Sequence, residues 1–67
     1  MISDEELASL GLRRVQKELA VGDLYVAKRN TGLHLLTVHA IRDGYVVSKE
    51  KAYSYDLWEC VPVEETP

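Results

Sequence analysis

Cys60, His34 and His39 are the residues whose chemistry could support catalysis or metal binding. A thiolate beside a histidine base can attack a carbonyl, and a zinc site needs three or four such ligands. His34 and His39 are five positions apart in one expected strand, so their side chains should point to opposite faces. The neighbouring sequence provides neither an oxyanion hole nor a further ligand. We therefore expect no enzyme activity, no cofactor and no metal, with Cys60 as a small core residue rather than the nucleophile of a Cys60–His39 hydrolase.

The aromatic residues are better suited to binding than to catalysis. The chain has four tyrosines, one tryptophan and no phenylalanine. Tyrosine and tryptophan combine a large contact area with a polar tip and dominate many protein interfaces. Trp58 is expected to fill the core, whereas Tyr45 and Tyr53 suit a core edge or a groove equally well. The predicted partner-binding residues are Tyr25, Leu35, His39, Ile41, Tyr45 and Tyr53.

The basic residues offer a second kind of binding site. The net charge is −3, with eight basic against eleven acidic residues. Nucleic-acid-binding proteins usually carry a basic excess, because neutralising phosphates provides much of their affinity. A local stripe could still follow a phosphate backbone, and the alternative is solubilising charge at strand ends. The candidate nucleic-acid contacts are Arg13, Arg14, Lys17, Lys28 and Arg29.

Length and composition indicate a single domain over residues 1–67. A chain this short has a marginal core, which natural domains often supplement with disulfides, a metal or a partner. The lone cysteine excludes an internal disulfide and fits the cytosol. The first ten residues lack a basic signal region, and no apolar run approaches the roughly 20 residues of a membrane span. The sequence therefore predicts a cytoplasmic protein without membrane contact.

The elements that must position these side chains begin with a predicted helical segment over residues 1–20. Residues 3–6, Ser-Asp-Glu-Glu, have the pattern of a capping box. An apolar stripe at helical spacing follows, formed by Ala8, Leu12, Val15 and Leu19. Gly11 interrupts this stripe, so the segment could divide there into a turn and a second helix over residues 12–19.

From residue 23 the apolar period changes from 3.6 to 2, which predicts strands. Three strands are expected over residues 24–29, 33–42 and 45–50. A short strand near 53–55 and one helical turn near 54–58 should follow. Residues 60–63 should then form an extended segment at a sheet edge, because Pro62 cannot donate to a ladder. The chain should end in a frayed acidic tail over residues 64–67.

Two glycine-containing turns set the predicted register of this sheet. Asn30-Thr31-Gly32 should form a three-residue hairpin loop, and Asp43-Gly44 a two-residue type I′ turn. The second turn should produce three pairs, namely Ile41 with Val46, Ala40 with Val47 and His39 with Ser48. Both faces of the sheet would then be largely apolar, with Tyr25 on the face of the odd-numbered residues 35–41. Either the sheet therefore curls into a small barrel with the helix covering part of its outside, or one apolar face meets a partner.

This order of elements resembles the small five-stranded barrel of the Src-homology-3 type over residues 21–63. The resemblance is carried by Gly22-Asp23, by the Asp43-Gly44 turn, and by Tyr55-Asp56-Leu57-Trp58 followed by Pro62. The chain is also similar to compact barrels found among phage-borne accessory proteins, including inhibitors of host defence. The resemblance implies an α+β fold in which an N-terminal helix precedes a small antiparallel β-barrel of about five strands.

We therefore predict a non-enzymatic protein-binding module. The resemblance implies a phage or mobile-element accessory protein, for example an anti-CRISPR protein, that inhibits a host complex. Its partner would be a host protein or nucleoprotein complex, and a homodimer could bury the second apolar face. The alternative is a small nucleic-acid-binding transcriptional regulator that uses the basic residues.

Overall fold

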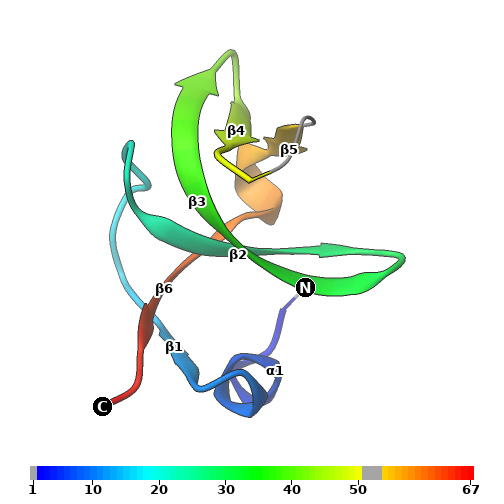
Figure 1. The fold of residues 1–67 in the computed structure, drawn as a ribbon, viewed down its shortest axis with the longest axis vertical. Helices are drawn as coiled ribbons and strands as arrows, with labels where there is room; N and C mark the ends of the chain where they lie inside the picture. Colours follow the sequence, from blue (N-terminus) through cyan, green and yellow to red (C-terminus); the bar gives the residue numbers. More distant parts are fainter. Residues whose placement is uncertain (1, 51–53) are drawn as a thin grey trace.

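The computed structural model describes residues 2–50 and 54–67, which form one short helix and a six-stranded antiparallel sheet (Figure 1). The elements are α1 (Asp4–Ser9), β1 (Leu12–Arg14), β2 (Leu24–Arg29), β3 (Gly32–Arg42), β4 (Tyr45–Ser48), β5 (Ser54–Asp56), the 3₁₀ turn η1 (Leu57–Glu59) and β6 (Val61–Glu65). The strand order in the sheet is β1-β6-β2-β3-β4-β5. The fold is therefore α+β as predicted, with a sheet of six strands that is not closed.

Helix α1 begins at the predicted capping box. The Ser3 hydroxyl accepts from the Glu6 N–H at 3.1 Å, and the Glu6 carboxylate accepts from the Ser3 N–H at 3.0 Å. The helix ends at Ser9 with Leu10 as its C-cap, because Gly11 adopts a left-handed conformation with φ +73°. The carbonyl oxygen of Gly11 accepts from the Thr66 N–H at 2.9 Å, which ties the helix end to the C-terminal segment.

The prediction of a helical segment to residue 20 is wrong beyond Gly11. Residues 12–14 form β1 instead, and Leu12 is buried in this strand. β1 pairs with β6, so residues 64 and 65 belong to a strand and the predicted frayed tail is also wrong there. The competing interaction is a long-range ladder, which overrides the local helical pattern.

The last strand is also not at the edge of the sheet, contrary to prediction, because β6 lies between β1 and β2. Pro62 sits where β1 has already ended. There its carbonyl accepts from the Val15 N–H at 3.0 Å, so the missing proline N–H falls outside the β1–β6 ladder. The short β1 thus lets a proline-containing strand occupy an inner position.

The first hairpin differs from the predicted one by a single residue. Arg29 pairs with Gly32, so the loop is the two residues 30–31 and Gly32, at φ +112°, already belongs to β3. Tyr25 consequently pairs with Leu36. A one-residue change of register moves side chains to the other face relative to the partner strand. The prediction that Tyr25 shares a face with the odd-numbered residues of β3 is therefore wrong.

The β3–β4 hairpin has the predicted turn. Asp43 and Gly44 both have positive φ, +51° and +80°, as a type I′ turn requires. The two pairs nearest the turn are confirmed, Ile41 with Val46 and Ala40 with Val47.

A β-bulge changes the register farther from this turn. The ladder shifts between Val38 and Ala40, so that Val38, and not His39, pairs with Ser48. A bulge adds a residue to one strand, bends it and increases its twist. The long strand β3 is strongly curved, and it pairs with β2 along its first half and with β4 along its second half (Figure 1). The predicted His39–Ser48 pair is therefore wrong.

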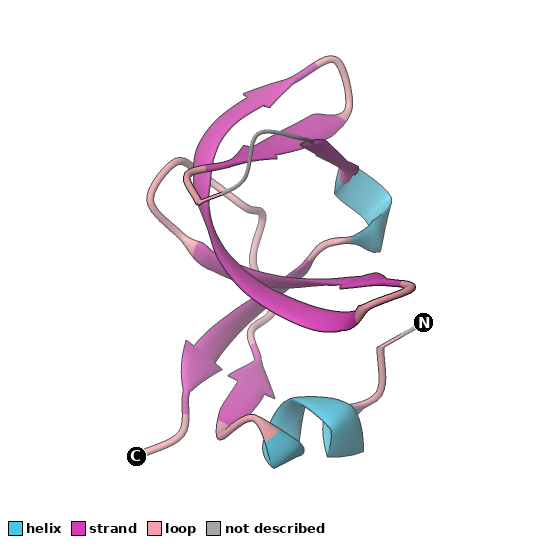
Figure 2. Ribbon diagram, turned by 45° about the vertical axis from the view of Figure 1, so that its right-hand side comes forward, coloured by secondary structure: helices cyan, strands magenta, loops and turns pink. Residues whose placement is uncertain are grey.

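Two groups of buried apolar side chains occupy the two faces of the curved sheet. The first group is Tyr25, Ala27, Leu36, Val38, Val46, Tyr55 and Cys60. The second group is Ile2, Leu7, Leu12, Val26, Val61 and Val63. Helix α1 lies beside β1 at the end of the molecule that carries the second group, as Figure 2 shows. The helix thus covers apolar surface that the sheet alone would leave exposed.

Within the described part of the chain, no helix has the length and apolar character needed to cross a bilayer.

Candidate binding groove

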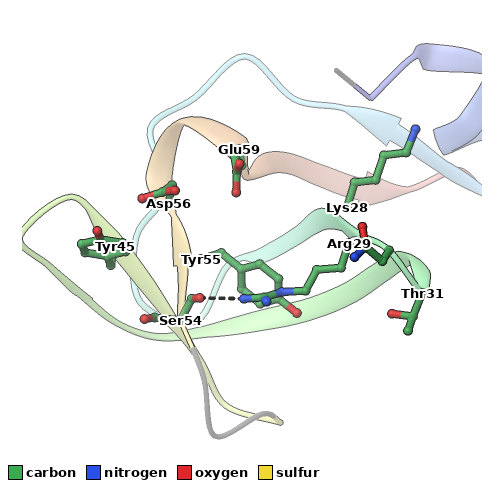
Figure 3. Close-up of a pocket in the computed structure, with 9 residues that line it drawn as sticks. Lys28, Arg29, Thr31, Tyr45, Ser54, Tyr55, Asp56 and Glu59 are labelled. Carbon is green, nitrogen blue, oxygen red and sulfur yellow. Dashed lines mark hydrogen bonds between the residues drawn. The ribbon is translucent and has the colours of Figure 1, made fainter.

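A groove of about 600 Å³ lies between the β2–β3 hairpin and the β5–η1 segment (Figure 3). Its lining residues are Lys28, Arg29, Asn30 and Thr31 on the hairpin, and Tyr45, Ser54, Tyr55, Asp56 and Glu59 opposite. β2 and β5 are not neighbours in the sheet, since β3 and β4 separate them. The groove therefore exists because the sheet curls and brings its β5 edge back towards β2.

Arg29 bridges the two walls of the groove. Its guanidinium carbon lies 4.5 Å from the centroid of the Tyr55 ring, and its Nη2 donates to the Ser54 carbonyl at 3.0 Å (Figure 3). The Tyr55 ring meets the Tyr25 ring edge to face, with centroids 6.2 Å apart. A cation above an aromatic face and an edge-to-face ring pair are both favourable. These contacts hold β5 against β2 without a backbone ladder.

The basic and acidic residues of the groove differ in whether they form ion pairs within the chain. Lys28 pairs with Glu6 of α1, its Nζ lying 3.3 Å from Oε2. Asp56 and Glu59, in contrast, form no carboxylate ion pair with any residue that the structure describes. Tyr45 closes one end and is 47% exposed. The groove therefore offers an aromatic ring and two carboxylates to a ligand, and both kinds of group suit a polypeptide.

The predicted partner-binding residues are not brought together by the structure. Of the predicted residues that the structure describes, only Tyr45 lines the groove, and the buried Tyr55 at its base was not among those predicted. Tyr25 is completely buried in the core, because the altered register turns it inward. The prediction that Tyr25 contacts a partner at the surface is therefore wrong, and its ring instead packs against the Tyr55 ring from the core.

The other predicted partner-binding residues lie elsewhere. Leu35 is 45% exposed, and His39 is exposed at the bulge. Ile41 is half-buried and lines a different depression, together with Leu57 and Cys60. Tyr53 is outside the described residues.

Trp58 is the surface residue that sequence reasoning missed. It was expected in the core, yet its side chain is 81% exposed on η1. No residue of η1 is buried, so this turn lies on the surface as a whole. Three residues are too few to show an apolar period, and the sequence therefore contained no signal for this exposure.

The five candidate nucleic-acid contacts all have partners within the chain. The ion pairs are Arg13 with Glu64, Arg14 with Asp4 at 3.1 Å, Lys17 with Asp23 at 2.9 Å and Lys28 with Glu6 at 3.3 Å, and Arg29 contacts Tyr55 and Ser54. The three basic residues of the 13–17 segment are therefore matched by acids, and they do not form an open stripe of positive charge.

The candidate catalytic residues are far from a reactive arrangement. Cys60 is buried, and its Sγ donates to the Asp56 carbonyl at 3.4 Å. Burial, with the nearby Glu59 and Asp56 carboxylates, raises the pKa of the Cys60 thiol to about 12. His34 lies 2.7 Å from the Thr31 hydroxyl through Nε2, and His39 faces solvent. Among the described residues, no group of three histidine, cysteine or acidic side chains could hold a metal ion.

No protein-family model, no curated protein and no solved structure matches the chain.

Proposed function

We propose that the protein is a non-enzymatic binding module that docks a segment of another protein in the groove between the β2–β3 hairpin and β5–η1. The observation that carries this proposal is the groove itself, with an exposed tyrosine at one end and two carboxylates that lack ion pairs among the described residues. Tyr45 can provide contact area, and Asp56 and Glu59 can accept from backbone or side-chain donors of a bound segment.

The finer fold assignment belongs to the same proposal. Strands β2, β3, β4 and β5 form a meander, η1 follows, and β6 returns to pair with β2. We propose that this order corresponds to a Src-homology-3-type barrel that is left open and is extended by α1 and β1. Binding between a hairpin loop and a single 3₁₀ turn would suit such a barrel.

The biological role that we propose is inhibition of a host complex by a phage or mobile-element accessory protein, for example an anti-CRISPR protein acting in the host cytoplasm. Small size, one cysteine and a negative net charge support a compact protein that acts by occupying a surface. The high pKa of Cys60 supports a non-enzymatic role, because the thiolate is the nucleophilic form and the thiol stays protonated near neutral pH.

A nucleic-acid-binding regulator is the alternative, and the ion pairs described above argue against it. Binding to phosphates would have to displace carboxylates from Arg13, Arg14 and Lys17. The two proposals predict that the protein retains different molecules from a lysate, namely nucleic acid or a partner protein. Nucleic-acid binding would weaken steeply as salt is raised, whereas docking in the groove would not require a basic surface.

The proposal is tested by using the tagged protein as bait in a bacterial host lysate and identifying the retained proteins. We expect Tyr45→Ala to weaken retention of the specific partner by about tenfold or more, as for an exposed tyrosine that is a hot-spot residue of an interface. Leu35→Ala is the matched control, because Leu35 is similarly exposed, at 45%, and lies outside the groove. Equal retention by both variants, or retention of nucleic acid alone, would contradict the proposal.

A further inference from the structure

A second, smaller depression lies beside the groove and is built around Trp58. It measures about 340 Å³ and is lined by Ile2, Lys28, Trp58, Glu59 and Val61. Ile2 and Val61 are buried apolar residues, 4% and 9% exposed, so the floor of this hollow is apolar. Trp58 stands at its side with 81% of its surface exposed. We call this depression the Trp58 hollow.

The rim of the Trp58 hollow carries one charge of each sign. Lys28 is on β2, and its side chain is 52% exposed although it pairs with Glu6. Glu59 ends η1 and has no ion pair among the described residues. A ligand that fits this hollow should therefore present an apolar group flanked by one acidic and one basic side chain.

The chain itself presents such a group, since the exposed Trp58 is flanked by Glu59 and stands near Lys28. We infer that the Trp58 hollow is occupied by Trp58 of a second copy of this chain in a two-fold homodimer. In an isologous contact, if residue i of one copy contacts residue j of the other, then residue j of the first copy contacts residue i of the second. One self-complementary patch thus places both tryptophans against apolar floors and forms two Lys28–Glu59 pairs across the axis.

The energetics favour this arrangement over a solvated tryptophan. Tryptophan has only two side-chain dihedral angles to immobilise and buries a large area, which makes it a frequent hot-spot residue. A domain of this size also has a marginal core and gains most from covering exposed apolar surface. The rim pairs fix the orientation of the two copies, because a two-fold arrangement that placed Lys28 against Lys28 and Glu59 against Glu59 would bring like charges together.

The dimer does not depend on the proposed function, although Lys28 and Glu59 line both depressions, because Trp58 lines the Trp58 hollow and not the groove. Tyr45 and Asp56 line the groove and not the Trp58 hollow. Loss of dimerisation in Trp58→Ala with retained host-protein capture would separate the two proposals, and so would the reverse result in Tyr45→Ala.

The test is sedimentation equilibrium of the full chain over a range of concentrations, with circular dichroism to confirm folding. We expect a reversible dimer whose dissociation constant rises by about 30-fold or more in Trp58→Ala. Val21→Ala, at a 70% exposed apolar residue outside the hollow, should leave the constant unchanged. Trp58 is the only tryptophan, so its emission should also shift to the blue as the protein is concentrated.

A charge exchange tests the two-fold geometry itself. Lys28→Glu and Glu59→Lys should each weaken self-association about tenfold, because both rim contacts become repulsive. An equimolar mixture of these two variants should form a heterodimer as tight as the wild type, since each contact then joins opposite charges. A monomer at all concentrations, a dimer unaffected by Trp58→Ala, or a mixture that stays monomeric would overturn the inference.

Discussion

Helix α1 should be an integral part of the folded unit, and Leu7→Ala tests this directly. Leu7 is fully buried, and it packs in the second core group with residues of β1, β2 and β6. Removing a buried leucine side chain costs about 2–5 kcal/mol, which combines lost burial with the cavity left behind. A protein of 67 residues has a total stability of about 3–10 kcal/mol. This single substitution should therefore remove a large part of the free energy of unfolding.

Leu10→Ala is the matched control for this prediction. Leu10 is the same residue type three positions away, but it is 46% exposed at the helix C-cap. It should lose less than about 1 kcal/mol, as expected for a surface substitution. Urea unfolding followed by far-ultraviolet circular dichroism measures both variants, since the exposed Trp58 reports weakly on unfolding. Equal, small losses in the two variants would refute the packing of α1 on the sheet.

Three further predictions concern the carboxylates, the cysteine and the central turn. The pKa values of Glu6, Asp23 and Glu50 are lowered in the folded state by hydrogen bonds from the Ser3 N–H, the Lys17 ammonium and the Thr37 N–H respectively. The unfolded chain then binds more protons in acid than the folded chain does. The free energy of unfolding should therefore be maintained above the ordinary carboxyl pKa and should decrease as the pH falls through the folded pKa values. In a pH series of urea titrations, this decrease should be shallower for Glu50→Gln than for the wild type. Cys60 should react slowly with a disulfide reagent in the native protein and fast in urea, because its thiol is buried with its pKa raised to about 12, and rapid native labelling would contradict this. Gly44→Ala should cost about 1 kcal/mol in the same urea titrations, because only the positive φ of +80° opposes a side chain there, and Gly44→Asn should cost less.

Local signals in the sequence predicted the local structure well. The capping box at residues 3–6 and the Asp43-Gly44 turn each depend on interactions within a few residues, and both are formed. The apolar alternation also located β2, β3 and β4 to within two residues at each end. These features require no knowledge of the partner strands.

The errors arose where distant residues decide the structure. Residues 12–14 have a helical apolar spacing, but pairing with β6, some 50 residues away, makes them a strand. Gly32 has a positive φ that fits either a three-residue loop or the start of a strand after a two-residue loop, and the choice determines which side of the sheet Tyr25 occupies.

The candidate site was less predictable than the fold. The groove joins β2 to β5, which are separated by two strands in the sheet, so it depends on the curvature that the bulge near His39 gives to β3. Tyr45 was identified because tyrosine combines a large contact area with a polar tip. Trp58 was placed in the core on the average burial of tryptophan, which carries no information about a three-residue surface turn.

Photo-crosslinking in the host cell tests most directly whether the groove binds a partner protein. A benzoylphenylalanine in place of Tyr45 should form a covalent adduct with one specific host protein on irradiation. The same group in place of Leu10, which is almost equally exposed at 46% against 47%, should form none. Adducts of equal yield at both positions, or no adduct at position 45, would contradict a binding function for the groove.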